Sequence, residues 1–547
     1  MQVCIAAMQA YDYAARRVIR SMLFMNTCEL ARYAPVPPQR RGAWPLVVVA
    51  LGFIMAMLDV TVVNVALADI RDDLSMSLAG QVWIVDGYTL TFAALLLAGG
   101  ALANRFGARA VYRAGLAAFV FASVLCGVAT SGKALVGARL LQGTAAALFI
   151  PSSLGLLARA YPDERERAGV MGLWSAIVSG SAASGPLVGG LLISCLDWRS
   201  IFWLNLPIGL VGVWLTPRYL DATPRQAQPL HLGAHGCAVL ALGGLAYVLI
   251  QGPSAGWDAL PVVAAAFTAA LASVGFARHQ RRDPQPVLPR GLVHDAGFRR
   301  INAIGLLINF GVYGTLFLMS LFNQQARHSS ALVTGLHLLP LMVMFTFGNL
   351  LAVRIVPRHG VAQTLRAGLT LAALGTAAAA ACALLDHRVP AWSIDTFVAL
   401  ANLGAAVAIP AMTSRVLAPA DARHTNSAAA ILNANRQIGA LVGVAAVGFA
   451  MHGAAAWHVK LPLILALLAA AFAAAAALAM RAPCIPSAIS PRPFASTEII
   501  RSGSSPTASG SVLESTLATA VSRGRRSRPP DRRSGRSSPR PCSGRRS

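Results

Sequence analysis

Long apolar segments separated by short polar ones fill the chain between Trp44 and Met480. An α-helix needs about 20 mostly apolar residues to cross a membrane. The pattern predicts fourteen such spans, at 44–68, 82–103, 113–130, 134–157, 168–193, 200–217, 233–251, 260–277, 301–322, 334–353, 366–385, 394–415, 427–451 and 460–480. We therefore expect an all-α polytopic membrane protein.

Composition supports this class and excludes others. Hydrophobic residues make up 56% of the chain and charged residues only 12%, whereas a soluble domain averages about 25% charged residues. The sequence has no Ser/His/Asp set, no phosphate-binding loop and no His or Cys cluster with metal-ligand spacing. We expect neither an enzyme nor a soluble binding module, and we predict no metal site and no cofactor.

Positive charge is distributed unevenly along the chain. Lys and Arg gather in the even-numbered loops between spans, which by the positive-inside rule places both termini in the cytoplasm. The last segment, 481–547, holds 13 Arg and 3 acidic residues and is rich in Ser, Pro and Gly. The formal net charge of +25 thus reflects topology and a tail, and it does not indicate a nucleic-acid partner.

An internal repeat divides the membrane body. Arg105-Phe-Gly107 precedes Arg113-Ala-Gly115, and Arg358-His-Gly360 precedes Arg366-Ala-Gly368 with the same spacing, eight spans later. Two six-helix halves with two linking helices between them account for that separation. The predicted organisation is an N-terminal extension (1–43), a first bundle (44–220), a linker with two helices (221–300), a second bundle (301–480) and a disordered tail (481–547).

Three charged residues lie inside the predicted spans of the first half. A carboxylate at mid-span is costly and usually marks a pathway, so Asp59 is a candidate proton site, with a structural hydrogen-bonding role as the alternative. Asp86 is either a second proton site, a counter-charge for a cationic substrate, or an interfacial acid that reaches water. Arg139 needs an acidic partner, which is Asp59 or Asp86, and a purely structural ion pair is the alternative.

Other polar and small residues are candidates for a cavity or a moving interface. The fifth span carries Gly180, Gly185, Pro186, Gly189 and Gly190, which allow close helix contact and bending, in a rocking interface or in ordinary packing. The candidates for a substrate cavity are Asn64, Gln142, Asn309, Tyr313, Gln324 and Arg436. Packing is the alternative role for most of them.

Several motifs resemble, in order and position, those of one transporter family. They are LDVTVVNVAL, QVWIVDGYTL, GALANRFGARAVYRAG, LVGARLLQGTAAALFIP, SGSAASGPLVGG, DWRSIFWLNLPIGL and NRQIGALVGVAAVG. The chain is similar to the major facilitator superfamily, and within it to the fourteen-span drug/proton antiporters of the EmrB, QacA and SmvA type. The second-span acid resembles that of QacA-type members, which export quaternary ammonium and other cationic compounds.

The resemblance implies roles for particular residues. Asp59, Asp86 and Arg139 match positions tied to proton coupling, and Gly185 and Pro186 match the antiporter motif. The loop that gates the cytoplasmic side corresponds to Gly100, Asn104, Arg105, Gly107 and Arg109. Two positions depart from the family pattern, because Asn104 stands where the family has Asp and Ala68 stands where it has Pro.

We therefore expect a proton-coupled multidrug efflux transporter that works by alternating access in a bacterial inner membrane. Its expected partners are protons, membrane lipid and a drug-like molecule, in particular an amphipathic cation. The resemblance leaves open whether a periplasmic adaptor and an outer-membrane channel act with the chain. The alternatives are a metabolite exporter or facilitator without proton coupling, and a transport-inactive membrane sensor.

Overall fold

The computed structural model describes residues 42–481, except 224, 226–230, 284–285, 386–389, 391, 418–424 and 453–454. The predicted N-terminal extension, apart from residues 42 and 43, and the predicted tail, apart from Arg481, lie outside these residues. Their predicted disorder stays a prediction.

Helices long and apolar enough to cross a membrane account for nearly all of the described chain, and there are 14 of them among the described residues. Their bounds are α3 (Trp44–Asp73), α4 (Leu78–Phe106), α5 (Ala108–Gly127), α6 (Gly132–Ala160), α7 (Glu164–Cys195), α8 with α9 (Ser200–Trp203 and Asn205–Tyr219), α10 (Leu232–Ala255), α11 (Leu260–Arg282), α13 (Ala296–Leu321), α14 (Ala331–His359), α15 (Val361–Leu385), α16 (Trp392–Leu417), α17 (Thr425–Met451) and α18 (Trp457–Met480). A short helix, α12 (Arg290–His294), precedes α13, and a π-helical segment, η1 (Phe322–Ala326), continues it. Each of the fourteen predicted spans is confirmed as a helix.

The helix ends differ from the predicted spans in a consistent way. Most helices are longer than the apolar run, because a helix continues into the polar region at the membrane surface after its apolar core ends. The first span was expected to end at residue 68, but α3 continues to Asp73. Helix α5 is shifted toward the N-terminus, since it spans Ala108–Gly127 where the prediction was 113–130.

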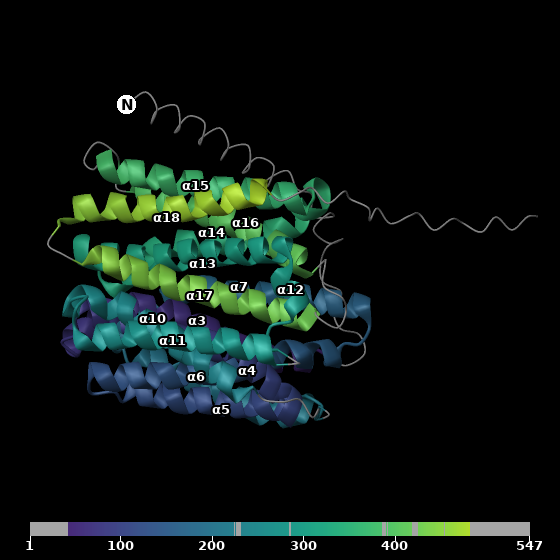
Figure 1. Ribbon diagram of the computed structural model, residues 1–547. Helices are drawn as coiled ribbons and strands as arrows, with labels where there is room; N and C mark the ends of the chain where they lie inside the picture. Colours follow the sequence, from purple (N-terminus) through teal and green to yellow (C-terminus); the bar gives the residue numbers. More distant parts are fainter. Residues whose placement is uncertain are drawn as a thin grey trace, which may run out of the picture. The chain divides into compact units, whose positions relative to one another are not determined.

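The helices pack as two groups of six (Figure 1). In the first group, α6 packs against α4 and α5, and α3 packs against α7 and α9. In the second group, α16 packs against α14 and α15, and α13 packs against α17 and α18. The groups meet where α7 lies along α14 and where α4 lies along α17. We call this contact the seam. The expected fold, two six-helix bundles with two linking helices, is confirmed.

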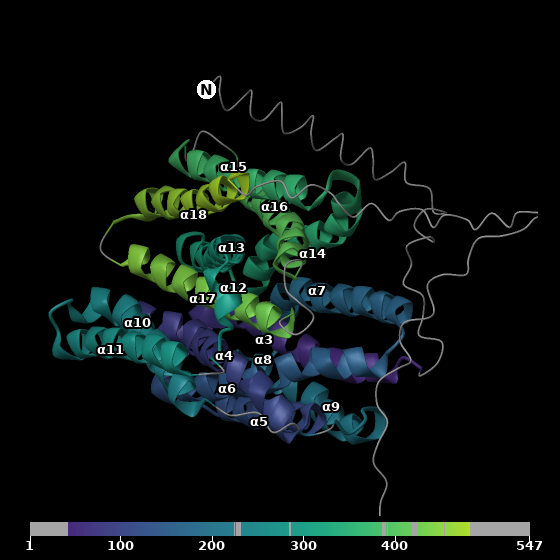
Figure 2. The same cartoon turned by 45° about the vertical axis from the view of Figure 1, so that its right-hand side comes forward.

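The linking helices form a hairpin beside the seam. Helix α10 packs against both α4 and α17, and α11 packs against α10 (Figure 2). Two aromatic contacts attach the hairpin, one from Trp83 of α4 to Tyr247 of α10, at 6.2 Å between ring centroids, and one from Trp257 to Phe449 of α17, at 5.9 Å. The predicted domain limits at residues 220 and 300 stay predictions.

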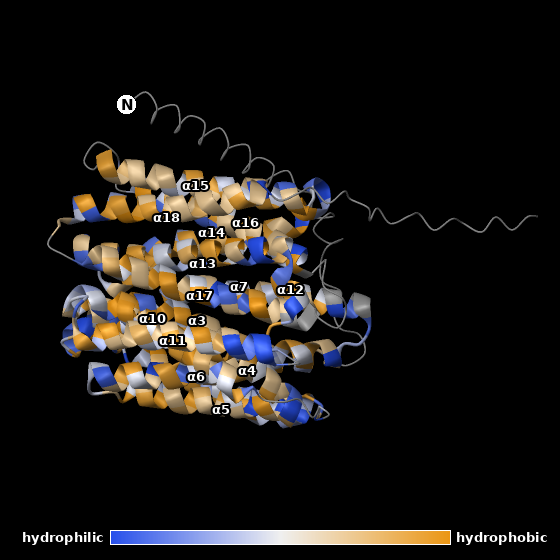
Figure 3. Cartoon of the chain, in the orientation of Figure 1, coloured by the Kyte–Doolittle hydropathy of each residue, from blue (hydrophilic) through white to orange (hydrophobic). Residues whose placement is uncertain are grey.

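The outer surface of the helices suits lipid. Figure 3 shows apolar residues along the middle of the helices and polar residues gathered at their two ends. Large apolar side chains face outward, among them Phe267 at 70% exposure and Leu260 at 80%. Such an apolar surface on a soluble protein would drive association, whereas on a spanning protein it is the lipid contact.

The two ends of the bundle are distinguished by their connections. One end carries the α3–α4 connection at residues 74–77, and we call it the 74–77 end. The other carries the α4–α5 turn at Gly107, and we call it the Gly107 end. The charge distribution predicts that the Gly107 end faces the cytoplasm.

Candidate functional site

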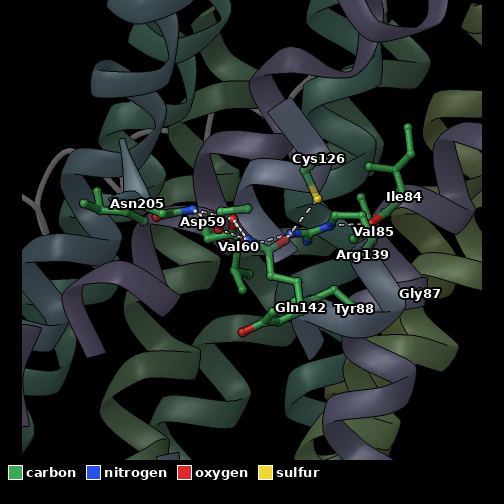
Figure 4. A network of polar contacts seen from close by, with 12 residues as sticks. Asp59, Val60, Ile84, Val85, Gly87, Tyr88, Cys126, Arg139, Gln142 and Asn205 are labelled. Carbon is green, nitrogen blue, oxygen red and sulfur yellow. Dashed lines mark hydrogen bonds and ion pairs between the residues drawn. The ribbon is translucent and has the colours of Figure 1, made fainter. Parts of the chain in front are cut away.

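A buried ion pair lies in the first bundle. Arg139 Nη1 on α6 is 2.5 Å from Asp59 Oδ2 on α3, and both side chains are only 1% exposed (Figure 4). The two residues are far apart in sequence, so the pair joins two helices that are not adjacent along the chain. Arg139 was predicted to pair with Asp59 or Asp86. In this structure the acid beside it is Asp59.

The second oxygen of the Asp59 carboxylate is also hydrogen-bonded. Gln142 Nε2 donates to Asp59 Oδ1 at 2.8 Å, and Asn205 Nδ2 donates to the same atom at 3.1 Å. Ser123 Oγ accepts hydrogen bonds from both amides, at 2.9 Å from Gln142 and 3.3 Å from Asn205. We call Asp59, Arg139, Gln142, Asn205 and Ser123 the Asp59 network.

Arg139 makes further contacts that fix its position. Its Nε donates to the backbone oxygen of Ile84 at 3.0 Å, and its Nη1 donates to Gln142 Oε1 at 2.6 Å. The guanidinium lies over the ring of Tyr88, 4.7 Å from the centroid, which adds a cation–π contact. The charge is therefore held by an acid, two neutral oxygens and a ring face.

Small residues bring α4 and α6 close enough for these contacts. A Cβ added at Gly143 of α6 would overlap the backbone oxygen of Tyr88 on α4. Thr91 of α4 also donates to the backbone oxygen of Leu140 at 2.8 Å. Gly143 thus serves close helix contact, and Arg139, one turn away on the same helix, is brought within reach of Ile84 and Tyr88 on α4.

The predicted site residues did not include Asn205, Ser123 or Tyr88. Asn205 had a usable signal, because it is a polar residue inside an apolar span, within the quoted motif DWRSIFWLNLPIGL. A serine and a tyrosine in apolar helices carry no such signal, since both are common in membrane spans for packing reasons. Their placement depends on how the helices pack.

Asp86 differs from Asp59 in every contact. It is fully buried on α4, and neither of its carboxylate oxygens has a hydrogen-bond partner among the described residues. Arg139 bonds the backbone of Ile84 on the same helix, two residues before Asp86, without bonding this carboxylate. Of the roles left open for Asp86, an acid that simply reaches water does not match its burial in this structure.

The glycines of α7 face two different helices. A Cβ added at Gly185 would overlap Thr61 Oγ1 of α3, and one added at Gly189 would lie 2.8 Å from Val62 Cγ1. A Cβ added at Gly190 would lie 2.8 Å from Leu332 Cα of α14, across the seam. Gly180, in contrast, has no atom within 4 Å of an added Cβ.

Pro186 lies on the seam as well. A Cβ added at Gly335 of α14 would overlap the backbone oxygen of Pro186. Further along the same pair of helices, Thr346 Oγ1 donates to the backbone oxygen of Ser179 at 2.9 Å. Helix α7 therefore touches α3 inside its own bundle and α14 in the other bundle. A role of these residues in a moving interface stays a prediction.

The predicted gating loop forms a turn at the Gly107 end. Gly107 has φ +93°, a conformation that side chains with a Cβ rarely adopt. Arg109 Nη1 donates to the backbone oxygen of Leu220 at 3.1 Å, which ties the turn to the end of α9. Asn104 and Arg105 are exposed, and Gly100 has no atom within 4 Å of an added Cβ.

Gln324, a predicted cavity residue, joins the two bundles at the 74–77 end. The backbone N–H of Ala68 donates to Gln324 Oε1 at 2.9 Å, and Gln324 Nε2 donates to the backbone oxygen of Val65 at 2.6 Å. The Ser320 hydroxyl donates to the backbone oxygen of Asn64. Gln324 sits in the π-helical segment η1, an irregularity that often marks functional positions.

The other predicted cavity residues are found in different settings. Asn64 and Asn309 are buried and donate to backbone oxygens of their own helices, at 2.8 Å from Val60 and 3.0 Å from Gly305 respectively. Tyr313 of α13 is partly buried. Gln142 belongs to the Asp59 network. Their role in binding a substrate stays a prediction.

Comparison with known proteins agrees with this architecture. The model of the Major Facilitator Superfamily matches residues 49–444. Among solved structures, the nucleoside transporter NupG has a TM-score of 0.57 at 11% identity, over 80% of this chain and 99% of its own. An auto-inhibited peptide transporter of the POT family has a TM-score of 0.60 at 15% identity, over 81% and 98%. At these identities the likeness concerns the fold alone.

Curated relatives are closer in sequence. The methylenomycin A resistance proteins of Bacillus subtilis and Streptomyces coelicolor are 46% and 42% identical, over 80% and 78% of this chain and 93% and 90% of their own lengths. The multidrug resistance protein Stp of Mycobacterium tuberculosis is 32% identical over 75% of this chain and 76% of its own. The chain thus belongs to the Major Facilitator Superfamily, whose members are membrane transporters rather than enzymes.

Proposed function

We propose that this protein exports drug-like molecules across the membrane in exchange for protons. The export of drugs is supported by relatives that are named for drug resistance and that align over most of their length. Proton coupling is supported by one observation above the others, which is the buried ion pair of Asp59 and Arg139. A proton-coupled transporter needs a carboxylate whose protonation changes the energy of the protein.

The geometry explains how a proton at Asp59 would act. While Asp59 is ionised, its charge offsets that of Arg139, and both side chains are buried. Adding a proton to the carboxylate removes the offset and leaves the guanidinium buried with neutral partners. Breaking a buried pair in this way costs about 3–5 kcal/mol in proteins. That cost is large enough to favour another arrangement of α3, α4 and α6.

The contact of Gln324 with α3 gives that rearrangement a direction. At the 74–77 end, Gln324 bonds the backbone of α3 near Val65 and Ala68, less than three turns from Asp59 on the same helix. A shift of α3 after protonation of Asp59 therefore strains the contact between the bundles at that end. Opening there and closing at the Gly107 end is the alternating access expected for this fold.

The sequence also predicted cationic substrates, which require a carboxylate that a cation reaches. In this structure the oxygens of Asp59 are taken by Arg139, Gln142 and Asn205, and Asp86 is enclosed. We therefore limit the proposal to amphipathic drug-like molecules. Cationic substrates, placement in a bacterial inner membrane with both termini cytoplasmic, and an adaptor with an outer-membrane channel stay predictions.

The experiment measures proton movement in proteoliposomes when methylenomycin A, the compound named by two relatives, is added. The wild-type protein is expected to move protons against the compound, and Asp59→Asn is expected to lose this movement while remaining in the membrane. Asp72→Asn is the matched control, because Asp72 is an exposed acid on the same helix.

Each other outcome points elsewhere. Compound flux without proton movement in the wild type would support a facilitator or an exporter without proton coupling. Binding of the compound without any flux would support the transport-inactive sensor, with Asn104 as the first position to change to Asp. Proton movement that persists in Asp59→Asn would overturn the role of the Asp59 network.

A further inference from the structure

The segment η1, which carries Gln324, has an unusual backbone. It follows the π-helical pattern, in which the N–H of Arg327 donates to the oxygen of Phe322, five residues earlier, at 3.1 Å. Such turns are rare and occur mostly singly, often at functional sites. A rare turn depends on its neighbours to hold it in place, and Arg327, the residue that follows η1, makes several such contacts.

Arg327 braces η1 from two sides. Its Nη1 donates to Asn323 Oδ1 within the segment at 2.9 Å, and its guanidinium lies over the ring of Phe322, 4.8 Å from the centroid. The same Nη1 donates to the carboxylate of Asp395 on α16, at 2.9 Å to Oδ2 and 3.2 Å to Oδ1. Arg327 therefore links η1 to α16 through a charge-assisted contact.

Asp395 is the only acidic residue within the bounds of the described helices α13 to α18. It lies in the first turn of α16, where an acid is favourable simply because it faces the N-terminus of a helix. The structure adds two partners to that setting. The Asp395 side chain is only 11% exposed, and His337 Nδ1 of α14 lies 3.0 Å from its Oδ2. The segment η1 and the helices α14 and α16 thus meet at this carboxylate.

The first bundle contacts η1 through two consecutive residues. Gln324 bonds the backbone of α3, as described above. The next residue, Gln325, donates to Gln81 Oε1 of α4 at 3.5 Å, and Gln81 Nε2 donates to the backbone oxygen of Leu67 at 2.9 Å. Both glutamines belong to the π-helical turn that Arg327 braces, so their placement depends on it.

We propose that Asp395 is a positioning residue for transport. Through Arg327 it holds η1 in the conformation in which Gln324 bonds α3, and it thereby keeps the bundles together at the 74–77 end. Loss of the carboxylate charge removes one side of this contact, loosens η1 and favours opening at that end. This inference rests on the proposed export function, and it assigns to the second bundle a residue that controls the opening that protonation of Asp59 drives from the first.

The experiment measures backbone hydrogen–deuterium exchange in the purified full-length protein in detergent, since exchange reports local opening. Two segments in different bundles are compared, η1 with its turn (322–330) and the end of α3 (64–73). Asp395→Asn keeps the shape of the side chain and removes its charge. Exchange is expected to become about tenfold faster in both segments, which is the effect of losing one charge-assisted hydrogen bond.

Exchange in α3 distinguishes a positioning role from a merely structural one. A local role of Asp395 would loosen η1 and leave segment 64–73, in the other bundle, at the wild-type rate. In the Gln324→Leu background, Asp395→Asn is expected to add no further change in segment 64–73, because the contact through which it acts is already absent. Faster exchange confined to 322–330, or unchanged exchange in both segments, would overturn the inference.

Three further variants complete the design. Asp395→Glu keeps the charge and is expected to recover part of the wild-type rate. Asp258→Asn, which removes an exposed acid between α10 and α11, is the matched control and is expected to leave both segments unchanged.

Arg327→Lys gives an independent reading if Asp395→Asn does not fold. A lysine keeps the positive charge but lacks the planar guanidinium that lies over Phe322. Exchange is expected to become faster in both segments, by less than in Asp395→Asn. Wild-type exchange in this variant would overturn the inference.

Transport gives a second readout. In proteoliposomes, Asp395→Asn is expected to slow the proton movement that methylenomycin A causes, whereas Asp59→Asn is expected to abolish it. The reason is that Asp395→Asn shifts the balance between two arrangements and leaves the proton site intact. A wild-type rate in Asp395→Asn would refute its role in transport.

The proposed function fails in a different way. Coupled exchange in the two segments, in a protein that moves no protons in proteoliposomes, would refute proton-coupled export and leave the control of η1 by Asp395 standing. Proton-driven export by a protein whose α3 exchange does not respond to Asp395→Asn would refute the positioning role and leave export standing.

Discussion

Arg139 pairs with Asp59, 80 residues away on α3, and not with Asp86 on the helix that it also touches. The two acids of the first bundle are therefore not equivalent. One is fully hydrogen-bonded within a network drawn from α3, α5, α6 and α9, and the other is enclosed without a partner in the described chain. This difference separates an acid that holds a counter-charge from one that does not.

The ion pair predicts non-additive effects on stability. Asp59→Asn and Arg139→Gln each leave one member of a buried pair unmatched, so each is expected to destabilise the protein by about 3–5 kcal/mol. The double variant leaves two neutral side chains and is expected to cost clearly less than the sum. Thermal unfolding in detergent of the four proteins measures this, and additive losses would show that the two charges do not interact.

For Asp86 we expect the opposite, namely little change in stability when its charge is removed. Because its carboxylate has no partner, an amide of the same shape is expected to change the stability of this state by only about 1 kcal/mol or less. Asp86→Asn is therefore expected to unfold near the wild-type temperature, well above Asp59→Asn. A loss as large as that of Asp59→Asn would mean that Asp86 has a charged partner.

The close contact of α7 with α3 predicts a strong effect of one methyl group. Gly185→Ala is expected to cost about 1–3 kcal/mol, because the added Cβ overlaps Thr61 Oγ1 and helix backbones must separate. Gly180→Ala, on the same helix with open space around it, is expected to be neutral.

Thermal unfolding and export rate are measured for both variants, and Thr61→Ala is combined with Gly185→Ala. The combination is expected to recover part of the lost stability, since it removes the overlapping oxygen. Equal behaviour of Gly180→Ala and Gly185→Ala would contradict the close approach.

The contact of Gln324 with α3 predicts a loss of about 1–3 kcal/mol in Gln324→Leu, because the Ala68 N–H and the Val65 carbonyl lose a side-chain partner in a buried place. Gln363→Leu, at an exposed position on α15, is the matched control. The apparent unfolding temperature is expected to fall only in the first variant. If both variants match the wild type, Gln324 does not hold the bundles together.

The sequence was sufficient to predict where the helices lie, because the thickness of the membrane sets the length of each apolar run. It was also sufficient to name Asp59, Arg139 and Gln142, since charged and amide groups inside apolar runs stand out. It left open which acid Arg139 would take, because that choice depends on the packing of α3 against α6 rather than on any local pattern.

Contacts between helices that are distant in the chain could not be predicted from the sequence for the same reason. Gln324 was predicted to line a cavity, and the structure places it against a backbone 256 residues away. Ser320 and Ser123 were not considered at all, because a single serine in an apolar helix is ordinary. Arg436 was named among several candidates, and only the absence of a described partner for its Nε distinguishes it.

The hairpin of α10 and α11 makes one tryptophan contact with each bundle, and these contacts can be followed by intrinsic fluorescence. Its Tyr247 touches Trp83 of one bundle, and its Trp257 touches Phe449 of the other. If α4 and α17 separate at the 74–77 end, as the proposed mechanism requires, a hairpin that follows one of the two helices moves its aromatic side chain away from the other. The emission of Trp83 and Trp257 is therefore expected to report which bundle the hairpin follows, without any attached dye.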